Sequence, residues 1–430
     1  MWGLVIFVMI GIQILLGVLY PAALVYVSLI VGSLPLSFGE GRPMSGALGK
    51  MDLSAFRLLG LWLASFLIVL FHLEKAAHYL KAFRIHLLFL AFCAAAITWA
   101  PSIAYGARMF GKLSSVLLFL LLIMLTISRR AQLKTMERLI LLSGLLLLAG
   151  ALGVQAAGVT ASEIGLTFPG VGPSLFSALL VVAALLALAS AKYAHWVRNL
   201  LCVTILSAGV IAAFTRITIA ALFVGCSTIL FMGFKGTLRF LLPVLSLVGF
   251  PVLFLFKETF KQRMFYGGHE ITLGALIQDP AIAMEHLHTS GRSMAWEAIF
   301  EKFFYPSPLV GSGLGATQDY YYSQTSGIGV IHSEYVRLLS ETGILGVSLF
   351  AVAALAYLGR LIRSYHRART TDTARYALAA TGALVAYLIY IATDNGFDYV
   401  TGFGIYVFSL IGMAEKSREF DEMSIPVASS

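Results

Sequence analysis

Long apolar runs separated by short polar loops make up most of this chain. Each run could cross the roughly 30 Å hydrocarbon core of a bilayer as a helix. The runs are residues 2–20, 21–38, 53–73, 85–101, 113–128, 138–156, 174–191, 199–214, 217–233, 240–256, 338–359, 376–393 and 399–414. Only Tyr20-Pro21 separates the first two runs, which favours a hairpin of two short spans. The pattern therefore predicts an all-α polytopic membrane protein with about 12–13 transmembrane helices.

The composition supports this fold class and excludes an ordinary soluble domain. Of the 430 residues, 59% are hydrophobic and 12% are charged, whereas soluble domains have about 25% charged residues. Residues 1–39 carry no charged side chain, so no cleaved signal peptide with a basic start is predicted. Cys93, Cys202 and Cys226 lie in apolar runs, which indicates packing rather than a metal site or a disulfide.

The distribution of lysine and arginine predicts the orientation in the membrane. Most of these residues fall in one alternating set of short loops, for example Lys75, Arg130, Arg198, Arg363 and Arg418. Loops rich in Lys and Arg face the cytoplasm, so this set and the C-terminus are predicted to be cytoplasmic. The net charge of +9 then reflects topology, and no basic segment for nucleic acid is predicted.

Loop lengths divide the chain into four parts. We expect an N-terminal transmembrane bundle over residues 1–256 and an extracytoplasmic loop subdomain over residues 257–337. C-terminal transmembrane helices are expected over residues 338–414 and a cytoplasmic tail over residues 415–430, of which residues 420–430 are predicted to be disordered. The loop subdomain is the only hydrophilic segment long enough to form a unit of its own.

The sequence "GRSMAWEAIFEKFF", residues 291–304, predicts a short amphipathic helix in that loop. Its aromatic and aliphatic residues recur with helical spacing, at Trp296, Ile299, Phe300, Phe303 and Phe304. Thr289 or Ser290 is a plausible N-cap, and Pro306 and Pro308 would end the helix. We expect such a helix to lie on the membrane surface or to cap the bundle.

Two arginines are candidates for binding an anion. Arg216 lies in the only polar position at which the chain can turn between two short spans, so it is predicted to lie below the outer surface. There it is either an arginine reaching from a helix end to the surface or part of an anion site. Arg292 opens the amphipathic helix, whose N-terminus also favours an anion, although a solvated loop charge is the alternative. Together, two guanidinium groups would suit a diphosphate.

His332 begins the sequence "HSEYVRLLSETGILG", residues 332–346, directly before a long apolar run. Histidine is suited to take a proton near neutral pH, whereas the ordinary alternative is a helix cap. Glu334, Arg337 and Glu341 follow on one helical stripe and are expected to pair along the helix. Glu341 is interpreted as part of a salt-bridged helix end, and the roles of Glu334 and Arg337 stay open.

Other polar features give weaker signals. "GSGLGA", residues 311–316, lacks the strand and the Lys-Ser/Thr of a phosphate loop and is predicted to be a flexible loop. Arg108 and Lys112 either add positive charge near the same outward pocket or anchor a span. Asp394 and Asp398 are predicted to cap helix ends. The chain has no zinc-type cluster, Walker motif or dinucleotide fingerprint, so neither a metal nor a cofactor is predicted.

In combination, these features resemble the bacterial O-antigen ligase and polymerase superfamily. The resemblance rests on an arginine after a late-middle span, then "GRSMAWEAIFEKFFYPSPLVGSGLG", then "HSEYVRLLSETGILG". Its specific part runs from Arg216 to Gly346, and "TDN" at residues 393–395 also looks like members of this group. Each piece alone is common, whereas the order and spacing of the pieces together are not.

The resemblance implies a metal-independent, inverting glycosyltransferase on the outer face of the bacterial inner membrane. The donor would be a glycan on undecaprenyl diphosphate, and the acceptor a lipid-linked repeat or lipid A-core. By position, Arg216 and Arg292 would hold the diphosphate and His332 would be the catalytic base, with Arg108, Glu334 and Arg337 as possible secondary residues.

Two questions remain open after the resemblance. Members are either O-antigen or exopolysaccharide polymerases, which the "TDN" triplet favours, or O-antigen ligases. The alternative from another class is a transporter or flippase for a lipid-linked or anionic substrate. A transporter places ionisable residues near the middle of the membrane, whereas the predicted spans of this chain are almost free of them.

Overall fold

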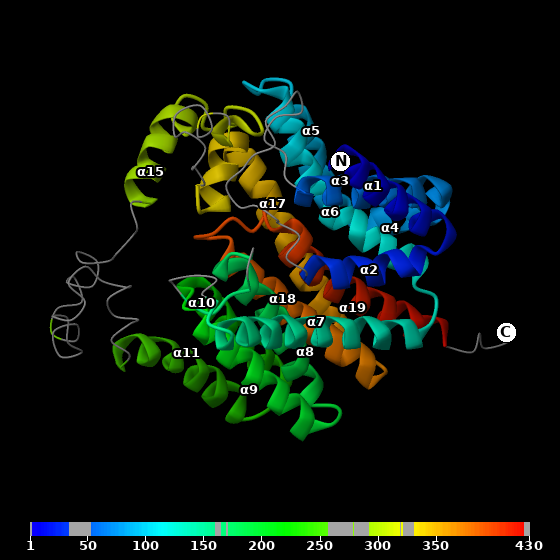
Figure 1. Cartoon of the computed structure of the whole chain (residues 1–430), viewed down its shortest axis with the longest axis vertical. Helices are drawn as coiled ribbons and strands as arrows, with labels where there is room; N and C mark the ends of the chain where they lie inside the picture. Colours follow the sequence, from blue (N-terminus) through cyan, green and yellow to red (C-terminus); the bar gives the residue numbers. More distant parts are fainter. Residues whose placement is uncertain are drawn as a thin grey trace.

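The computed structural model describes residues 2–33, 53–159, 165–168, 171–256, 278, 292–318, 320 and 331–424. Over these ranges the secondary structure is helical and contains no strand (Figure 1). The helices are α1 (Trp2–Leu19), α2 (Pro21–Ser33), α3 (Leu53–Phe71), α4 (Leu73–Ala82), α5 (Arg84–Ala96), α6 (Ile103–Thr126), α7 (Arg130–Ala156), α8 (Pro173–Ala191), α9 (Trp196–Ala212), α10 (Arg216–Gly233), α11 (Leu238–Phe256), α15 (Arg292–Ile299), the π-helix η1 (Phe300–Phe304), α17 (Glu334–His366), α18 (Thr371–Tyr390), the π-helix η2 (Val400–Gly404) and α19 (Ile405–Met423).

Each predicted apolar run overlaps a helix, and the last one overlaps both η2 and α19, which confirms an all-α polytopic membrane protein. The first two runs are separate helices, α1 and α2, with the break at Tyr20. By length and composition, five helices in the described residues are able to cross a membrane: α6, α7, α8, α10 and α17. A sixth is possible if α3 and α4, which meet at a bend of 106°, are counted as one span. The amphipathic α4 was not predicted.

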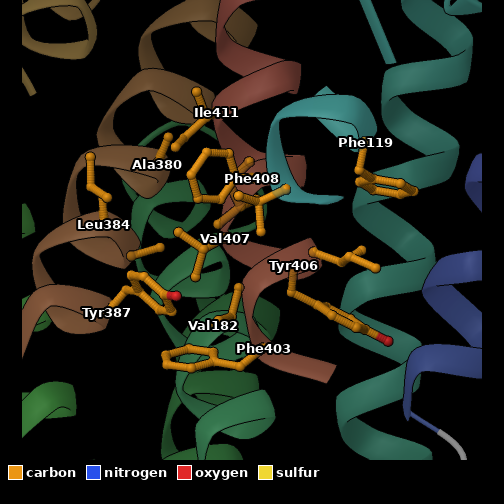
Figure 2. Close-up of a cluster of buried hydrophobic side chains, with 14 of the residues drawn as sticks. Phe119, Val182, Ala380, Leu384, Tyr387, Phe403, Tyr406, Val407, Phe408 and Ile411 are labelled. Carbon is orange, nitrogen blue, oxygen red and sulfur yellow. The ribbon is translucent and has the colours of Figure 1, made fainter. Parts of the chain in front are cut away.

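Two C-terminal helices, α18 and α19, lie between the two halves of the bundle. In Figure 1, α1 to α6 gather on one side and α8 to α11 on the other. Figure 2 shows side chains from α6, α8, α18 and α19, such as Phe119, Val182, Tyr387 and Phe408, packed in this centre. Where α10 crosses α18, a Cβ added to Gly225 or to Gly382 would lie 3.1 Å from the carbonyl oxygen of the other glycine. Small residues therefore allow these two backbones to approach closely.

The helix α17 is broken at Gly343, so the predicted continuous span over residues 338–359 is corrected. Gly343 has φ 63° and ψ −169°. The N–H groups of Ile344 and Leu345 donate to the carbonyl oxygens of Pro308 and Leu309, at 2.9 and 3.1 Å. These external acceptors replace those that a helix break removes. The break separates a short first segment, which carries Glu334 and Arg337, from the long apolar segment that follows.

The predicted amphipathic helix is confirmed as α15 and η1, which together run from Arg292 to Phe304. Its indole donor, Nε1 of Trp296, bonds the carbonyl oxygen of Ile331 at 2.7 Å. Ile299 and Phe303 are buried against Ile331 and other residues near the start of α17. The helix therefore covers the beginning of α17 (Figure 1). The proposed N-caps, Thr289 and Ser290, lie outside the described residues.

The segment 311–316 is a buried connection, which corrects the predicted flexible loop. Glu341 holds it from the end of the first segment of α17. The Glu341 carboxylate accepts from the N–H of Gly315 at 2.8 Å and from the hydroxyl of Thr317, and its carbonyl oxygen accepts from the N–H of Gly313 at 3.0 Å. Glu341 is therefore bound to this loop, and the interpretation as a salt-bridged helix end is wrong.

The opposite end of the bundle collects the basic residues that were predicted to be cytoplasmic. Arg130 at the start of α7 pairs with Asp421 at 2.7 Å, and Arg360 near the end of α17 pairs with Glu415 at 2.7 Å. Asp421 and Glu415 belong to α19, which continues to Met423. Residues 420–423 are therefore helical rather than disordered, and residues 425–430 lie outside the described residues. The division into a loop subdomain and flanking bundles, and the side of the membrane, stay predictions.

We predict that Gly343→Ala destabilises the protein by about 2–4 kcal/mol, because a positive φ is costly for alanine and the new Cβ has no space. A Cβ at this position would lie 2.4 Å from the backbone carbon of Leu309. Thermal unfolding of the detergent-purified protein would measure the loss. Gly359→Ala is the matched control, because a Cβ there meets no atom within 4 Å. An equal melting temperature for both variants would contradict the role of Gly343.

Candidate functional site

The loop that joins α18 to η2 forms the centre of a polar site. It contains the triplet Thr393-Asp394-Asn395, directly after the end of α18. Asp394 and Asn395 are buried, at 5% and 2% exposed. The loop meets the first turn of α17, where the N–H of Glu334 donates to the carbonyl oxygen of Ile391 at 2.9 Å. Two elements far apart in sequence therefore bring their polar residues to one place.

His332 is fixed by its backbone. It has φ 53°, which is uncommon and costly for a residue other than glycine and is often found at functional sites. Its N–H donates to Oδ1 of Asn395 at 3.0 Å. The N-cap of α17 is the next residue, Ser333, whose hydroxyl accepts from the N–H of Val336 at 3.3 Å. His332 is therefore not a helix cap.

The imidazole of His332 is held through Nδ1 and is 40% exposed. Nδ1 lies 3.2 Å from Nδ2 of Asn395 and 3.8 Å from Oδ1 of Asp394. Among the described residues, these contacts all involve Nδ1. The other ring nitrogen, Nε2, is then the atom that can face a substrate hydroxyl.

Asn395 and Asp394 favour different tautomers of the imidazole. The Asn395 amide is oriented by its bond to the His332 N–H, so Nδ2 presents a hydrogen to Nδ1 and favours the proton on Nε2. A carboxylate at Nδ1 instead favours the proton on Nδ1, which leaves Nε2 free to accept one.

Asp394 is a buried carboxylate that stays ionised, and it does not cap a helix as predicted. Burial alone would raise its pKa. The proximity of His332, the hydroxyl of Ser174 and the N–H of Asn395, which donates at 2.8 Å, outweigh burial and hold the pKa of Asp394 below its ordinary value. Ser174 also bonds the hydroxyl of Tyr390 at 2.8 Å. The first turn of α8 therefore fixes the position of this carboxylate.

Arg292, the first residue of α15, contacts the same triplet. Its Nη1 donates to the carbonyl oxygen of Thr393 at 2.7 Å. Thr393 precedes Asp394 and Asn395, which contact His332. Two of the three predicted site residues, Arg292 and His332, are therefore held on three consecutive residues. A guanidinium has five N–H donors, so the one hydrogen bond that Arg292 makes to a described residue leaves it donors for an anion.

Arg216 begins α10 at the same end of the bundle, as the predicted turn requires. Two residues later, Thr218 accepts a hydrogen bond at 2.9 Å from Ser177 of α8. Ser174, one turn earlier on α8, contacts Asp394. The first turns of α8 and α10 therefore connect Arg216 to the region of the triplet. The side chain of Arg216 is half-buried.

A buried charge network supports the first segment of α17. The Glu334 carboxylate accepts from the N–H of Phe397 at 2.8 Å and pairs with Arg337 at 3.1 Å. Arg337 pairs in turn with Asp398 at 2.9 Å, and Lys112 of α6 contacts the same carboxylate. Asp398 is not a helix cap. Burial would raise its pKa, but Arg337 and then Lys112 outweigh it and hold the pKa far below the ordinary value.

The other secondary candidates have structural partners or stay predictions. Glu334 and Arg337 pair as expected along the helix, and in the described residues their contacts are with this network rather than with the imidazole. Arg108 lies one turn before Lys112 and is half-buried. Its Nε atom is buried and has no hydrogen-bond partner among the described residues. Within the described residues, no group of three or more His, Cys, Asp or Glu is placed to hold a metal ion.

Sequence reasoning missed the partners of His332. Asp394 had been interpreted as a helix cap, and Asn395 and Ser174 had received no role. The "TDN" triplet was noted only as part of a resemblance. The signal in the sequence is that an acid and an amide, Asp394 and Asn395, follow directly after a span. Periodicity cannot show which distant histidine these two side chains contact.

Comparison with known proteins supports one family. Residues 200–351 match the model of a family described as O-antigen ligase. The matched segment runs from α9 into α17 and contains Arg216, Arg292 and His332. No curated protein matches the chain. The match confirms the resemblance to the O-antigen ligase and polymerase superfamily that the motifs indicated.

We predict that Asp398→Asn destabilises the protein by about 3 kcal/mol, because it leaves buried cations without their shared anion. Thermal unfolding would measure the change. Adding Lys112→Met should recover part of the stability, since one of the two cations is removed. Glu422→Gln is the control: it breaks an exposed pair, with Glu422 59% exposed, and should cost less than about 1 kcal/mol. Wild-type stability of Asp398→Asn would contradict the network.

Proposed function

We propose that this membrane protein, which belongs over residues 200–351 to the O-antigen ligase family, transfers a glycan from undecaprenyl diphosphate to an acceptor sugar hydroxyl. The reaction is inverting and metal-independent, and it takes place on the extracytoplasmic face of the bacterial inner membrane. The acceptor is either a lipid-linked repeat unit or lipid A-core.

One observation carries the proposal: Arg292 and His332 are both held on the triplet Thr393-Asp394-Asn395. Arg292 bonds the carbonyl oxygen of Thr393 at 2.7 Å, and Nδ1 of His332 lies 3.8 Å from Asp394. A cation for the leaving diphosphate and a base for the acceptor are the two groups that this displacement needs. Their attachment to one short segment supports a common pocket for both.

The bond changes follow from these roles. Nε2 of His332 takes the proton from the acceptor hydroxyl while its oxygen forms a bond to the anomeric carbon of the donor sugar. The bond between that carbon and the diphosphate oxygen breaks on the opposite face, which inverts the configuration. Arg292 and Arg216 stabilise the negative charge that develops on the departing undecaprenyl diphosphate, because guanidinium pairs bidentately with phosphate oxygens.

Asp394 is proposed as the positioning residue for His332. Its ionised carboxylate stabilises the imidazolium that forms when Nε2 takes the proton. It also favours the tautomer with the proton on Nδ1, whereas Asn395 favours the tautomer with the proton on Nε2. Ser174 and the Asn395 N–H keep the carboxylate in place, so the imidazole rather than the aspartate adjusts.

The basic residues support the outward location of the site. The arginines at the end of α17 and the start of α7 lie at the opposite end from His332. By the positive-inside rule that end is expected to face the cytoplasm, which supports an extracytoplasmic location for the His332 end. A transporter remains the alternative class. Purified protein with a lipid-linked donor distinguishes the two, because only the enzyme forms a new glycosidic bond without a gradient.

We predict that His332→Ala slows transfer by about 10²–10⁴-fold, because general base catalysis has this magnitude. Arg216→Lys and Arg292→Lys should each cost about 10²-fold or more, since a point charge cannot grip two phosphate oxygens. Complementation of a strain lacking the gene, read as the glycan profile on a gel, tests all three. Loss of a polymerase leaves single repeat units, which we expect from the "TDN" triplet. Loss of a ligase leaves long glycan on the lipid carrier.

Two control variants should keep the wild-type profile. His78 and Arg198 are exposed and lie at the opposite, basic end of the bundle, so His78→Ala and Arg198→Lys test for general damage. Membrane insertion of every variant is checked by its amount in the membrane fraction. A normal glycan profile in the His332→Ala strain would eliminate the proposed base.

We predict that Asp394→Asn lowers kcat by about 10²-fold or more and leaves KM for the donor nearly unchanged, because it alters the imidazole and not the diphosphate site. Its melting temperature should stay near that of the wild type, since asparagine has the same shape. Ser174→Ala removes only one bond to the carboxylate and should be much milder. A large rise in KM with an unchanged kcat would contradict a positioning role.

A further inference from the structure

A second polar region lies at the basic end of the bundle, where α17 ends, α18 begins and α19 ends. A pocket of about 400 Å³ opens there between the three helices. Five of the residues that line it are arginines: Arg360, Arg363, Arg367, Arg369 and Arg418. From Gly343 to Arg363, α17 rises roughly 30 Å at about 1.5 Å per residue, the thickness of a hydrocarbon core. This pocket is therefore at the membrane surface opposite to the site of His332.

The acidic residues of the pocket already have partners. Glu415 is 2% exposed and is bound by Arg360 at 2.7 Å and by Arg418 at 2.9 Å. Asp421 pairs with Arg130 at 2.7 Å. The third acid, Glu422, pairs with Arg418 at 2.6 Å. Each acid of the pocket thus pairs with Arg360 or Arg418 of the wall or with Arg130, which does not line the pocket.

Three arginines of the wall remain without an acid. Among the described residues, Arg363 donates only to the carbonyl oxygen of Gly359 in its own helix, at 3.1 Å. The guanidinium groups of Arg367 and Arg369 have no acidic partner among the residues that the structure describes. All three side chains are exposed. The pocket therefore has an excess of positive charge that an anion can neutralise.

A buried hydroxyl also lies in the wall. Ser364 lines the pocket and is 2% exposed, and its Oγ has no hydrogen-bond partner within the described part of the chain. A buried donor left unpaired is costly, so an oxygen acceptor in the pocket would relieve this cost. Ser364 follows Arg363 directly, and Arg367 lies one turn further along α17.

The remaining wall is a fixed turn at the start of α18. Asp421 accepts from the backbone N–H groups of Arg369 and Thr370, at 3.2 and 3.3 Å. Thr370 caps the 20-residue α18 by accepting from the N–H of Thr373 at 3.3 Å. The N-terminus of a long helix adds positive potential. The hydrogen bonds to Asp421 therefore hold the backbone of Arg369 against α19.

We propose that this pocket binds a phosphate group. Three guanidinium groups without acidic partners among the described residues and a buried hydroxyl donor together match the several oxygens and the charge of a phosphate. A carboxylate would use fewer of these donors. The proposal concerns a site separate from that of His332 and does not depend on the proposed glycosyl transfer.

The phosphate can come from an anionic lipid headgroup or from a soluble compound. The pocket lies at a membrane surface, where basic pockets between helices bind anionic headgroups, so the lipid is the expected source. Binding of inorganic phosphate at matched ionic strength would indicate the soluble source.

The test is ligand-dependent thermal unfolding of the full chain in a neutral detergent. The probes are short-chain phosphatidylglycerol, short-chain phosphatidylcholine and inorganic phosphate with chloride as the ionic-strength match. We expect phosphatidylglycerol to raise the melting temperature with concentration and phosphatidylcholine to have no such effect. The triple variant Arg363→Gln, Arg367→Gln, Arg369→Gln should bind at least about tenfold more weakly. No stabilisation of the wild type by phosphatidylglycerol or phosphate would overturn the proposal.

Matched variants separate a built site from general attraction by charge. Arg84, Arg138 and Arg198 are exposed and do not line the pocket, so their triple substitution to glutamine removes the same charge. This control should respond to the probe as the wild type does, and an equal loss in both triple variants would refute a specific site. Ser364→Ala should weaken the response without lowering the melting temperature in the absence of the probe. An unchanged response would exclude Ser364 from the site.

Discussion

Pairing of the buried charges at the start of α17 is the constraint on which the rest of the site depends. Glu334 and Arg337 are 0% and 4% exposed within a largely apolar bundle, where an unpaired charge is very costly. They pair with each other, Glu334 accepts from the N–H of Phe397, and Arg337 pairs with Asp398, which Lys112 also contacts. These bonds attach the loop after α18 to α17. The attachment positions the triplet that carries Asp394 and Asn395 beside His332.

The break in α17 gives the "ETG" part of the motif a structural meaning. Glu341 fixes the buried 311–316 loop, and Gly343 permits the backbone to turn before the long apolar segment begins. The short first segment can then follow the loop after α18, while the remainder follows the packing of the bundle. In sequence, Glu334, Arg337 and Glu341 look like one charged helix end. In the structure, Glu334 and Arg337 bind the loop after α18, whereas Glu341 binds the 311–316 loop beside the break at Gly343.

The two polar ends of the bundle differ in how their charges are balanced. At the His332 end, Asp398 and Glu334 pair with Arg337 at the helix start, and within the described residues Arg292 donates to a carbonyl oxygen. At the basic end, the acids are satisfied and three arginines are left over. Positive charge in excess of acidic partners is thus present at both surfaces. At one end it lies beside His332 and the triplet, and at the other it lines the pocket between α17, α18 and α19.

The sequence by itself determined the helices, the position of the turn at Arg216 and the amphipathic helix from Arg292, because hydrophobic spacing is a local property. It also indicated Arg216, Arg292 and His332 as candidate site residues, through the order of motifs. Only the tertiary structure decided that Asp394 faces His332, that Glu341 holds a glycine loop and that α17 breaks at Gly343. These contacts join residues that are distant in sequence. Their partners follow from how helices pack, and hydropathy carries no information about which helix ends meet.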